Sequence, residues 1–337
     1  MKRSSLYLSR NLSRRALLKS AAASAILPAA GLFPAPAIAQ QYPSRDISFV
    51  CAFPAGSGSD TIVRYVAEKI RPLTGRTILV ENRFGAAGNV SAEYVMRSKP
   101  DGHTILVHAA SALAANMYLF KKPPVDSAKD VTVAATINRQ PFMMVVDAKK
   151  PWKTVAEVTE FLKAKGDKAT YATSASNGTV MGEIYKQKTG VKAVEVIFRV
   201  GVDSLNDLLS GAIDYGMYDP VFSMSQAREG RVRMLAVSTA QRMSAVPDLP
   251  TMTEAGVPMD LMGWFAAMVP VDTPKPIVNQ INAWFKTVIA TDDAKAFLNK
   301  FGGDPWVATP EEAQARLLKD TKDWGDYVRV AKIEPQG

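Results

Sequence analysis

The chain has 337 residues, enough for two lobes with separate hydrophobic cores, and it carries a net charge of +9. Residues 1–39 hold six of the basic residues and no acidic ones, so the remaining 298 residues carry only +3. This small excess removes the main support for nucleic-acid binding. A single cysteine excludes an intrachain disulfide bond.

The first 39 residues are expected to be an export signal. The stretch "SRRALLK" (13–19) places a twin arginine before an Ala-rich apolar run, and "AIA" (37–39) forms a small-x-small cleavage site. A membrane anchor is the alternative, but three prolines interrupt the apolar run. We therefore expect cleavage after Ala39, a periplasmic protein, and no later membrane span.

Strand and helix patterns alternate along the next part of the chain. In "DISFVCAF" (46–53), Cys51 falls on the same strand face as Ile47 and Phe49, which predicts a buried, inert thiol. Helical patterns then cover 61–75 and 91–97, and strand patterns cover 77–82 and 104–110. This alternation predicts a parallel sheet with helices on both faces.

Strand and helix patterns continue through the middle and end of the chain. The middle reads as strands at 142–147, 169–174 and 194–198, helices at 154–166 and 177–190, and a helix followed by a strand within 202–219. The end is more helical, at 274–290 and 308–320. Thr309, Pro310 and Glu312 form a capping box at the start of the last helix. These C-terminal helices are expected to cover the first lobe.

The residues available for catalysis are few. The only histidines, His103 and His108, lie in or beside one strand at odd spacing, which would point them to opposite faces. Metal-ligand spacings, the G-x-S-x-G of serine hydrolases and the Walker loop are all missing from the sequence. We therefore expect no enzyme, no metal and no cofactor, although a triad assembled from distant residues stays open.

Residues suited to binding an anion are more numerous. "PAGSGSD" (54–60) and "SASNGT" (174–179) each follow a strand and precede a helix, so each offers hydroxyls and unpaired helix-start N–H groups. Either loop alone could be an ordinary helix cap. Two such loops, one in each expected lobe, suit a ligand held at the carboxyl ends of the strands.

A third segment, "IFRVG" (197–201), has two possible roles. Arg199 could pair with a carboxylate or be a solvated loop charge. Phe53 and Phe198 could form apolar walls of the same cleft or pack in the core.

Several longer segments resemble one family. "YPSRDISFVCAFPAGSGSD", "ILVENRFGAAGNVSAEYV", "KPDGHTILV", "YATSASNGT", "LNDLLSGAIDYGMYD", "MLAVSTAQRMSAVPDLPTMTEAGVP" and "GWFAAMVPVDTPKPIVNQIN" occur in its order over nearly the whole chain after residue 39. On these segments the chain resembles the solute-binding receptors of tripartite tricarboxylate transporters, also called Bug receptors.

The resemblance implies a two-lobed α/β periplasmic binding protein of type II, each lobe a sheet flanked by helices, with its ligand in the interlobe cleft. Lobe one would comprise 40–139 and 263–337, and lobe two 140–262. A monomer would close over a small carboxylate and deliver it to a two-component membrane permease. The implied ligand-binding residues are Phe53, Ala55, Gly56, Ser57, Gly58, Ser59, Asp60, Ser111, Ser174, Ser176, Asn177, Gly178, Thr179, Phe198, Arg199 and Asp219. In relatives that bind amino acids, an acid at Asp219 can meet the amine; here it could equally hold a loop.

Departures from the family pattern bear on the ligand. The third loop usually reads Pro-Tyr-Lys/Arg-Gly-Gly, and this chain has Ile-Phe-Arg-Val-Gly, which makes that wall more apolar. Ser57 adds a hydroxyl where glycine is common. These changes favour an aromatic mono- or dicarboxylate such as terephthalate over citrate. A ligand sensor for a signalling kinase shares every sequence feature, and a periplasmic hydrolase is the remaining alternative.

Overall fold

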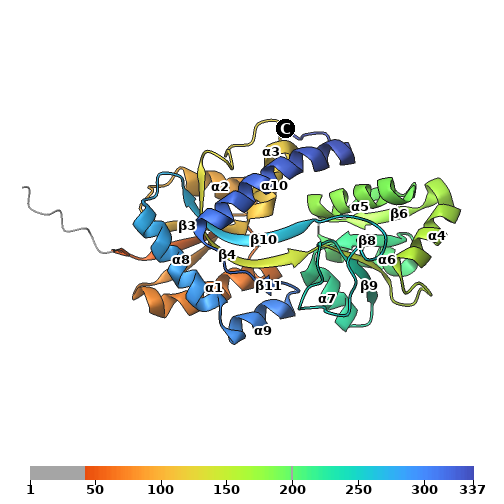
Figure 1. Cartoon of the computed structure of the whole chain (residues 1–337), viewed down its shortest axis with the longest axis horizontal. Helices are drawn as coiled ribbons and strands as arrows, with labels where there is room; N and C mark the ends of the chain where they lie inside the picture. Colours follow the sequence, from red (N-terminus) through yellow and green to blue (C-terminus); the bar gives the residue numbers. More distant parts are fainter. Residues whose placement is uncertain (1–41, 199) are drawn as a thin grey trace, which may run out of the picture. The chain divides into compact units, whose positions relative to one another are not determined.

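The computed structural model describes residues 42–198 and 200–337, so the export signal, its cleavage site after Ala39, and Arg199 lie outside the described residues. The described chain builds two sheets, one of six strands in the order β11-β4-β10-β3-β1-β2 and one of five in the order β7-β6-β8-β5-β9 (Figure 1). Helices flank both sheets, which makes this a mixed α/β fold. None of the helices described is long and apolar enough to cross a membrane.

The six-stranded sheet contains strands from both ends of the chain. Its strands are β1 (Ile47–Cys51), β2 (Ile78–Asn82), β3 (Thr104–Ala109), β4 (Val131–Pro141), β10 (Met262–Pro270) and β11 (Asp304–Pro305). The helices around it are α1 (Gly58–Thr74), η1 (Ala86–Gly88), α2 (Asn89–Met96), α3 (Ala110–Leu119), α8 (Lys275–Ile289), α9 (Asp292–Lys300) and α10 (Pro310–Ala331).

The five-stranded sheet uses only the middle of the chain. Its strands are β5 (Met143–Asp147), β6 (Thr170–Thr173), β7 (Val194–Ile197), β8 (Tyr215–Tyr218) and β9 (Val232–Val237). Its helices are α4 (Val155–Lys165), η2 (Gly166–Lys168), α5 (Ser176–Thr189), η3 (Gly201–Ser204), α6 (Leu205–Ser210) and α7 (Pro220–Arg228).

The expected parallel pairing holds in only part of each sheet. β1 pairs in parallel with β2 and β3, and β6 with β7 and β8, as the alternation predicts. The prediction is wrong for β10, which runs antiparallel to β3 and β4, and for β5, which runs antiparallel to β8 and β9. The physical reason is that β5 follows β4 after one residue and β10 re-enters the first sheet late in the chain, so neither is joined to its neighbours by a helical crossover.

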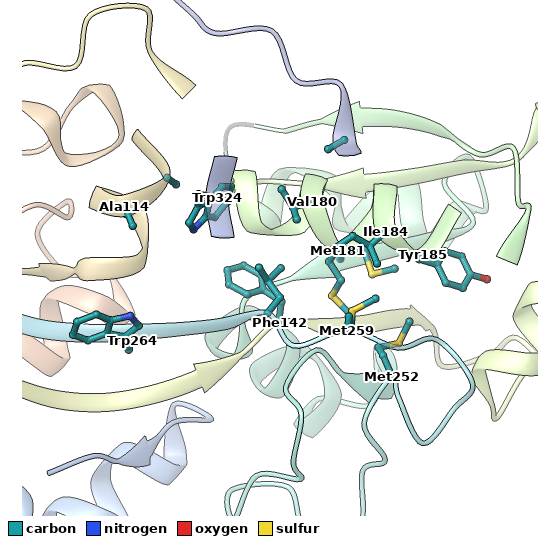
Figure 2. Packing of buried hydrophobic residues seen from close by; sticks show 14 of the residues in the cluster. Ala114, Phe142, Val180, Met181, Ile184, Tyr185, Met252, Met259, Trp264 and Trp324 are labelled. Carbon is teal, nitrogen blue, oxygen red and sulfur yellow. The ribbon is translucent and has the colours of Figure 1, made fainter. Parts of the chain in front are cut away.

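Apolar side chains cover both faces of the six-stranded sheet. On one face, Ile47, Phe49 and Cys51 of β1 pack with residues of α1 and α8. This confirms the predicted burial of Cys51, whose pKa burial raises to about 11. On the other face, residues of α3 and α10 pack in a cluster that continues to α5 of the middle segment (Figure 2). The C-terminal helices therefore cover the first sheet, as expected, and the capping box of Thr309 and Glu312 is present.

Trp264 of β10 is the largest side chain with no exposed surface, and its removal is expected to lower the stability of the fold strongly (Figure 2). Its Nε1 donates to Asp320 Oδ2 at 2.6 Å, and its ring meets the edge of Trp306 at 5.1 Å between centroids. We expect Trp264→Ala to lower the free energy of unfolding by about 4 kcal/mol, because it leaves a cavity and removes the donor to Asp320 Oδ2, while Asp320 Oδ1 keeps its ion pair with Arg316.

Urea denaturation measures that cost. Trp264→Phe keeps most of the ring volume and loses only the donor, so about 1 to 2 kcal/mol is expected from the lost hydrogen bond to the carboxylate. Equal losses of unfolding free energy in the two variants would show that the cavity is not the main cause of the destabilisation.

Candidate functional site

The sheet topology places each predicted loop at the edge of its own sheet where the parallel strands end. β1, β2 and β3 end at one edge of the first sheet, where the chain enters α1, η1 and α3. β6, β7 and β8 end at one edge of the second sheet, where the chain enters α5, η3 and α7. The predicted site residues at 53–60 and 111 belong to the first edge, and those at 174–179, 198 and 219 belong to the second.

The first loop already holds a carboxylate of the chain itself. Asp60, 1% exposed, accepts hydrogen bonds from the Gly56 amide at 2.8 Å, Arg64 Nε at 2.9 Å and Asn82 Nδ2 at 2.7 Å. Gly56 adopts φ +79°, which allows its amide to turn toward this carboxylate. Asp60 is therefore the acidic group around which the loop is built.

The charge of Asp60 is stabilised by these donors. Burial by itself would raise the pKa of the Asp60 carboxyl, but the hydrogen bonds from Arg64, Asn82 and Gly56 hold that pKa below its usual value. The carboxylate consequently stays ionised at neutral pH and fixes the turn that leads into α1.

The other residues of the first loop lie around this turn. The Ser57 hydroxyl caps α1 by accepting from the Asp60 amide at 3.2 Å, and Ala55 is exposed. Gly58 and Ser59 are the first two residues of α1, where backbone N–H groups lack intrahelical acceptors. The backbone amides of Gly58 and Ser59 are therefore donors of this loop that stay available to an anion.

A second helix start lies at the same edge. Ser111, 4% exposed, is the second residue of α3, and α3 begins without a side-chain cap. His108, just before it on β3, packs at 5.1 Å from the half-buried Phe53 ring, and burial lowers the pKa of its imidazole to about 4. This part of the edge therefore combines an uncapped helix start with a neutral imidazole and an aromatic ring.

The second loop also leads into an uncapped helix. Ala175, the N-cap residue of α5, provides no side-chain hydrogen bond. Ser174 and Ser176 are partly exposed, whereas Asn177 is buried and its Nδ2 has no partner among the described residues. A Cβ on Gly178 would lie 2.4 Å from the Met217 carbonyl oxygen, so only glycine lets α5 pack this close to β8.

The hydroxyl of Thr179, the last residue of the second loop, already donates to an acceptor within the chain. Thr179 Oγ1 donates to Glu195 Oε1 of β7 at 2.5 Å, and Thr173 Oγ1 donates to the same oxygen at 2.7 Å. Sequence reasoning missed Glu195, because an acid in a four-residue edge strand carries no pattern that marks it.

Phe198 and Asp219 directly follow β7 and β8, the two strands on either side of β6. Asp219 Oδ1 accepts from the Phe222 amide at 3.0 Å and caps α7, and burial raises the pKa of the Asp219 carboxyl. Phe198 is half-buried, and its amide donates to the Thr173 carbonyl at 2.8 Å. Its ring packs against the cluster that contains Phe222.

Glycines show which of these segments meet. A Cβ on Gly58 would lie 2.6 Å from Val221 Cγ1, which places the start of α1 against the start of α7, two residues beyond Asp219. A Cβ on Gly201 would lie 3.0 Å from the Phe222 ring, so the third segment reaches the same helix. Val221 was not predicted, and nothing in its local sequence distinguishes it from a core valine.

The described residues contain no group of three or more His, Cys, Asp or Glu placed to hold a metal ion. The edges offer instead amide N–H groups, hydroxyls and aromatic rings. Such donors suit a carboxylate or another small anion.

Comparisons with known proteins agree with this chemistry. The family model described as "Tripartite tricarboxylate transporter family receptor" matches residues 62–331. Among curated proteins, the chain is 26% identical to "Protein BugT" of Bordetella pertussis, over 88% of this chain and 92% of that protein.

Solved structures show the same fold. The chain is similar to "R. palustris Rpa4515 with adipate", with a TM-score of 0.79 and 28% identity over 88% of this chain and 100% of that one. It is also similar to "MatC (Rpa3494) from Rhodopseudomonas palustris with bound malate", with a TM-score of 0.73 and 26% identity over 85% and 100%. These relatives are binding receptors rather than enzymes, and the chain belongs to the tripartite tricarboxylate transporter receptor family.

Proposed function

We propose that this receptor captures a small carboxylate between two lobes, 40–139 with 263–337 and 140–262, and closes over it. The ligand would contact the loops at 53–60 and 174–179, with Ser111, Phe198, Arg199 and Asp219 around it. Closure follows if the ligand binds both lobes at once, because a ligand shifts a conformational equilibrium only by its differential affinity.

The observation that carries this proposal is a pair of helix starts without a side-chain cap. Each of these two helices, α3 and α5, follows a strand of its own sheet at the edge described above. The helices α2, α6 and α8 also lack a side-chain cap, but α2 and α6 continue from η1 and η3, and α8 follows β10, which runs antiparallel to β3. The remaining α-helices that the structure describes are capped by Ser57, Thr154, Asp219, Thr291 and Thr309. Uncapped helix starts bind carboxylates through backbone N–H groups. The adipate and malate named for two similar receptors are carboxylates of this size.

An aromatic mono- or dicarboxylate such as terephthalate is the preferred ligand class. Phe53 and Phe198 are both half-buried, so each keeps ring surface for a ligand. Phe53 is held at 5.3 Å from Phe265 and 5.1 Å from His108, which orients it without covering it. Aromatic rings of this kind stack with a planar ligand.

We further propose export to the periplasm with cleavage after Ala39, and delivery of the ligand by a monomer to a two-component membrane permease. A ligand sensor that presents its closed form to a signalling kinase would use the same site. Copurification with permease subunits rather than a kinase would favour the transport role.

The ligand is testable by thermal unfolding of residues 40–337 with aliphatic, aromatic and amino-acid carboxylates. A compound at about 100 times its dissociation constant adds about 2.7 kcal/mol to stability, a clear rise in melting temperature. We expect aromatic carboxylates to give the largest rises. Rises with only citrate or amino acids would contradict the aromatic preference, and no rise with any carboxylate would contradict the receptor function proposed.

A further inference from the structure

Glu195 places a carboxylate at the second anion-binding loop. It lies on edge strand β7 opposite Tyr171 of β6, and it is half-buried. The hydroxyls of Thr173 and Thr179 both donate to its Oε1 atom, at 2.7 and 2.5 Å. The chain's own acid therefore takes the hydroxyl donor that a ligand carboxylate would have used.

The negative charge of Glu195 has no matching cation among the residues that the structure describes. Glu183, on the adjacent helix, provides a direct contrast, because its Oε1 lies 2.6 Å from Lys186 Nζ and also accepts from Tyr171. The ion pairs of residues 42–198 and 200–337 do not include Glu195. Within residues 42–198 and 200–337, Glu195 is thus an acid without an ion-pair partner beside the start of α5.

A side chain in the first turn of α5, two residues before Thr179, has a donor without an acceptor among the described residues. Asn177 is 7% exposed, and its Nδ2 has no hydrogen-bond partner among the described residues. A buried amide donor requires an acceptor, since leaving it unpaired costs free energy. Glu195 in turn accepts hydrogen bonds and repels anions.

We infer that Glu195 selects ligands that have one carboxylate and carry a hydrogen-bond donor, not a second carboxylate, on the end that faces α5. This inference rests on the proposed function and narrows its ligand class, from mono- or dicarboxylates such as terephthalate to monocarboxylates. A hydroxyl group on the ligand would pair with both side chains of the second loop, because its oxygen would accept from Asn177 and its hydrogen would donate to Glu195. The ligand's carboxylate then belongs at the first sheet, near the uncapped start of α3 and the amides of Gly58 and Ser59.

Matched ligands test the inference. Adipate, 6-hydroxyhexanoate and 6-aminohexanoate share one chain length, and terephthalate and 4-(hydroxymethyl)benzoate share one ring. Calorimetric affinities are measured for the wild type and for Glu195→Gln, whose side-chain oxygen can still accept from both threonines. We expect the wild type to bind the hydroxy acid at least tenfold more tightly than the matching dicarboxylate, and Glu195→Gln to reduce that ratio by tenfold or more.

Glu183→Gln is the matched control, because Lys186 already neutralises the acid that it removes. It is expected to leave the affinity ratio unchanged. A ratio that is the same in Glu195→Gln as in the wild type, or tighter binding of the dicarboxylate by the wild type, would overturn the inference while leaving the receptor function intact. If no carboxylate binds any of the three proteins, the proposed function fails and this inference fails with it.

Discussion

Asp60→Ala is expected to lower the free energy of unfolding by about 3 kcal/mol and to abolish the response to carboxylates. The substitution leaves the Gly56 amide without its acceptor and removes the carboxylate partner of Arg64, which keeps its hydrogen bond to Asn82 Oδ1. Asn82 Nδ2 loses one of its two acceptors and keeps the Phe53 carbonyl. The cost is placed at the lower end for a broken buried ion pair because the Arg64 side chain is 48% exposed. Urea denaturation measures the stability, and thermal unfolding with the best carboxylate of the panel measures binding.

The same residue predicts a pH dependence. Because the folded state holds the pKa of Asp60 below its usual value, its contribution to stability is present above the ordinary aspartate pKa of about 3.9. That contribution is lost as the pH falls through the lower pKa of the folded state. The difference in stability between wild type and Asp60→Ala is therefore expected to shrink below about pH 4.

Asp46→Ala is a suitable control because Asp46 is an exposed acid just before β1, at the end of the strand away from Asp60. Among the described residues, its carboxylate accepts from the Thr77 amide alone, at 3.2 Å. The substitution is expected to change stability by less than about 0.5 kcal/mol. If Asp60→Ala were no more damaging than this control, or if its cost did not vary with pH, Asp60 would not be the organising acid of the loop.

Local patterns predicted the elements that carry their own start and stop signals. The helix closed by Gly166 and the capping box at Thr309 are both present where the sequence indicated. α3 was missed because Ala109 and Ala110 suit the end of a strand and the start of a helix equally, and no capping side chain separates them. β4 and β10 depend on pairing between segments more than 120 residues apart, which no local period reveals.

For the candidate site, the sequence indicated two loops, which the fold places at the strand ends of the two sheets, and it gave incomplete roles to the residues within them. Glycines and hydroxyls before a helix predict free amides, but they do not show which acceptor those groups already have. Asp60 and Thr179 were both predicted to face the ligand, and each has a partner within the chain. The partner of Thr179, Glu195, comes from a neighbouring strand, so only the folded register could identify it. The roles of these residues toward a ligand stay predictions.

Gly58→Val is expected to weaken carboxylate binding at least tenfold while changing the stability of the ligand-free protein little. Gly58 begins α1, and a Cβ there would lie 2.6 Å from Val221 Cγ1 and 3.6 Å from Phe301 Cδ1. A branched side chain would force the start of α1 away from the start of α7. If the ligand must contact both sheets at once, this separation removes part of its binding free energy.

Removing the obstructing side chain should reverse the effect. In Gly58→Val combined with Val221→Ala, the two Cγ atoms of Val221 are gone, so the start of α1 can again approach α7. We expect the double variant to recover most of the lost affinity, and Val221→Ala alone to bind like the wild type. Non-additivity of this kind is expected only for residues in contact. Additive losses would instead mean that valine at position 58 acts on α1 itself, and that the approach of these two helix starts does not contribute to ligand binding.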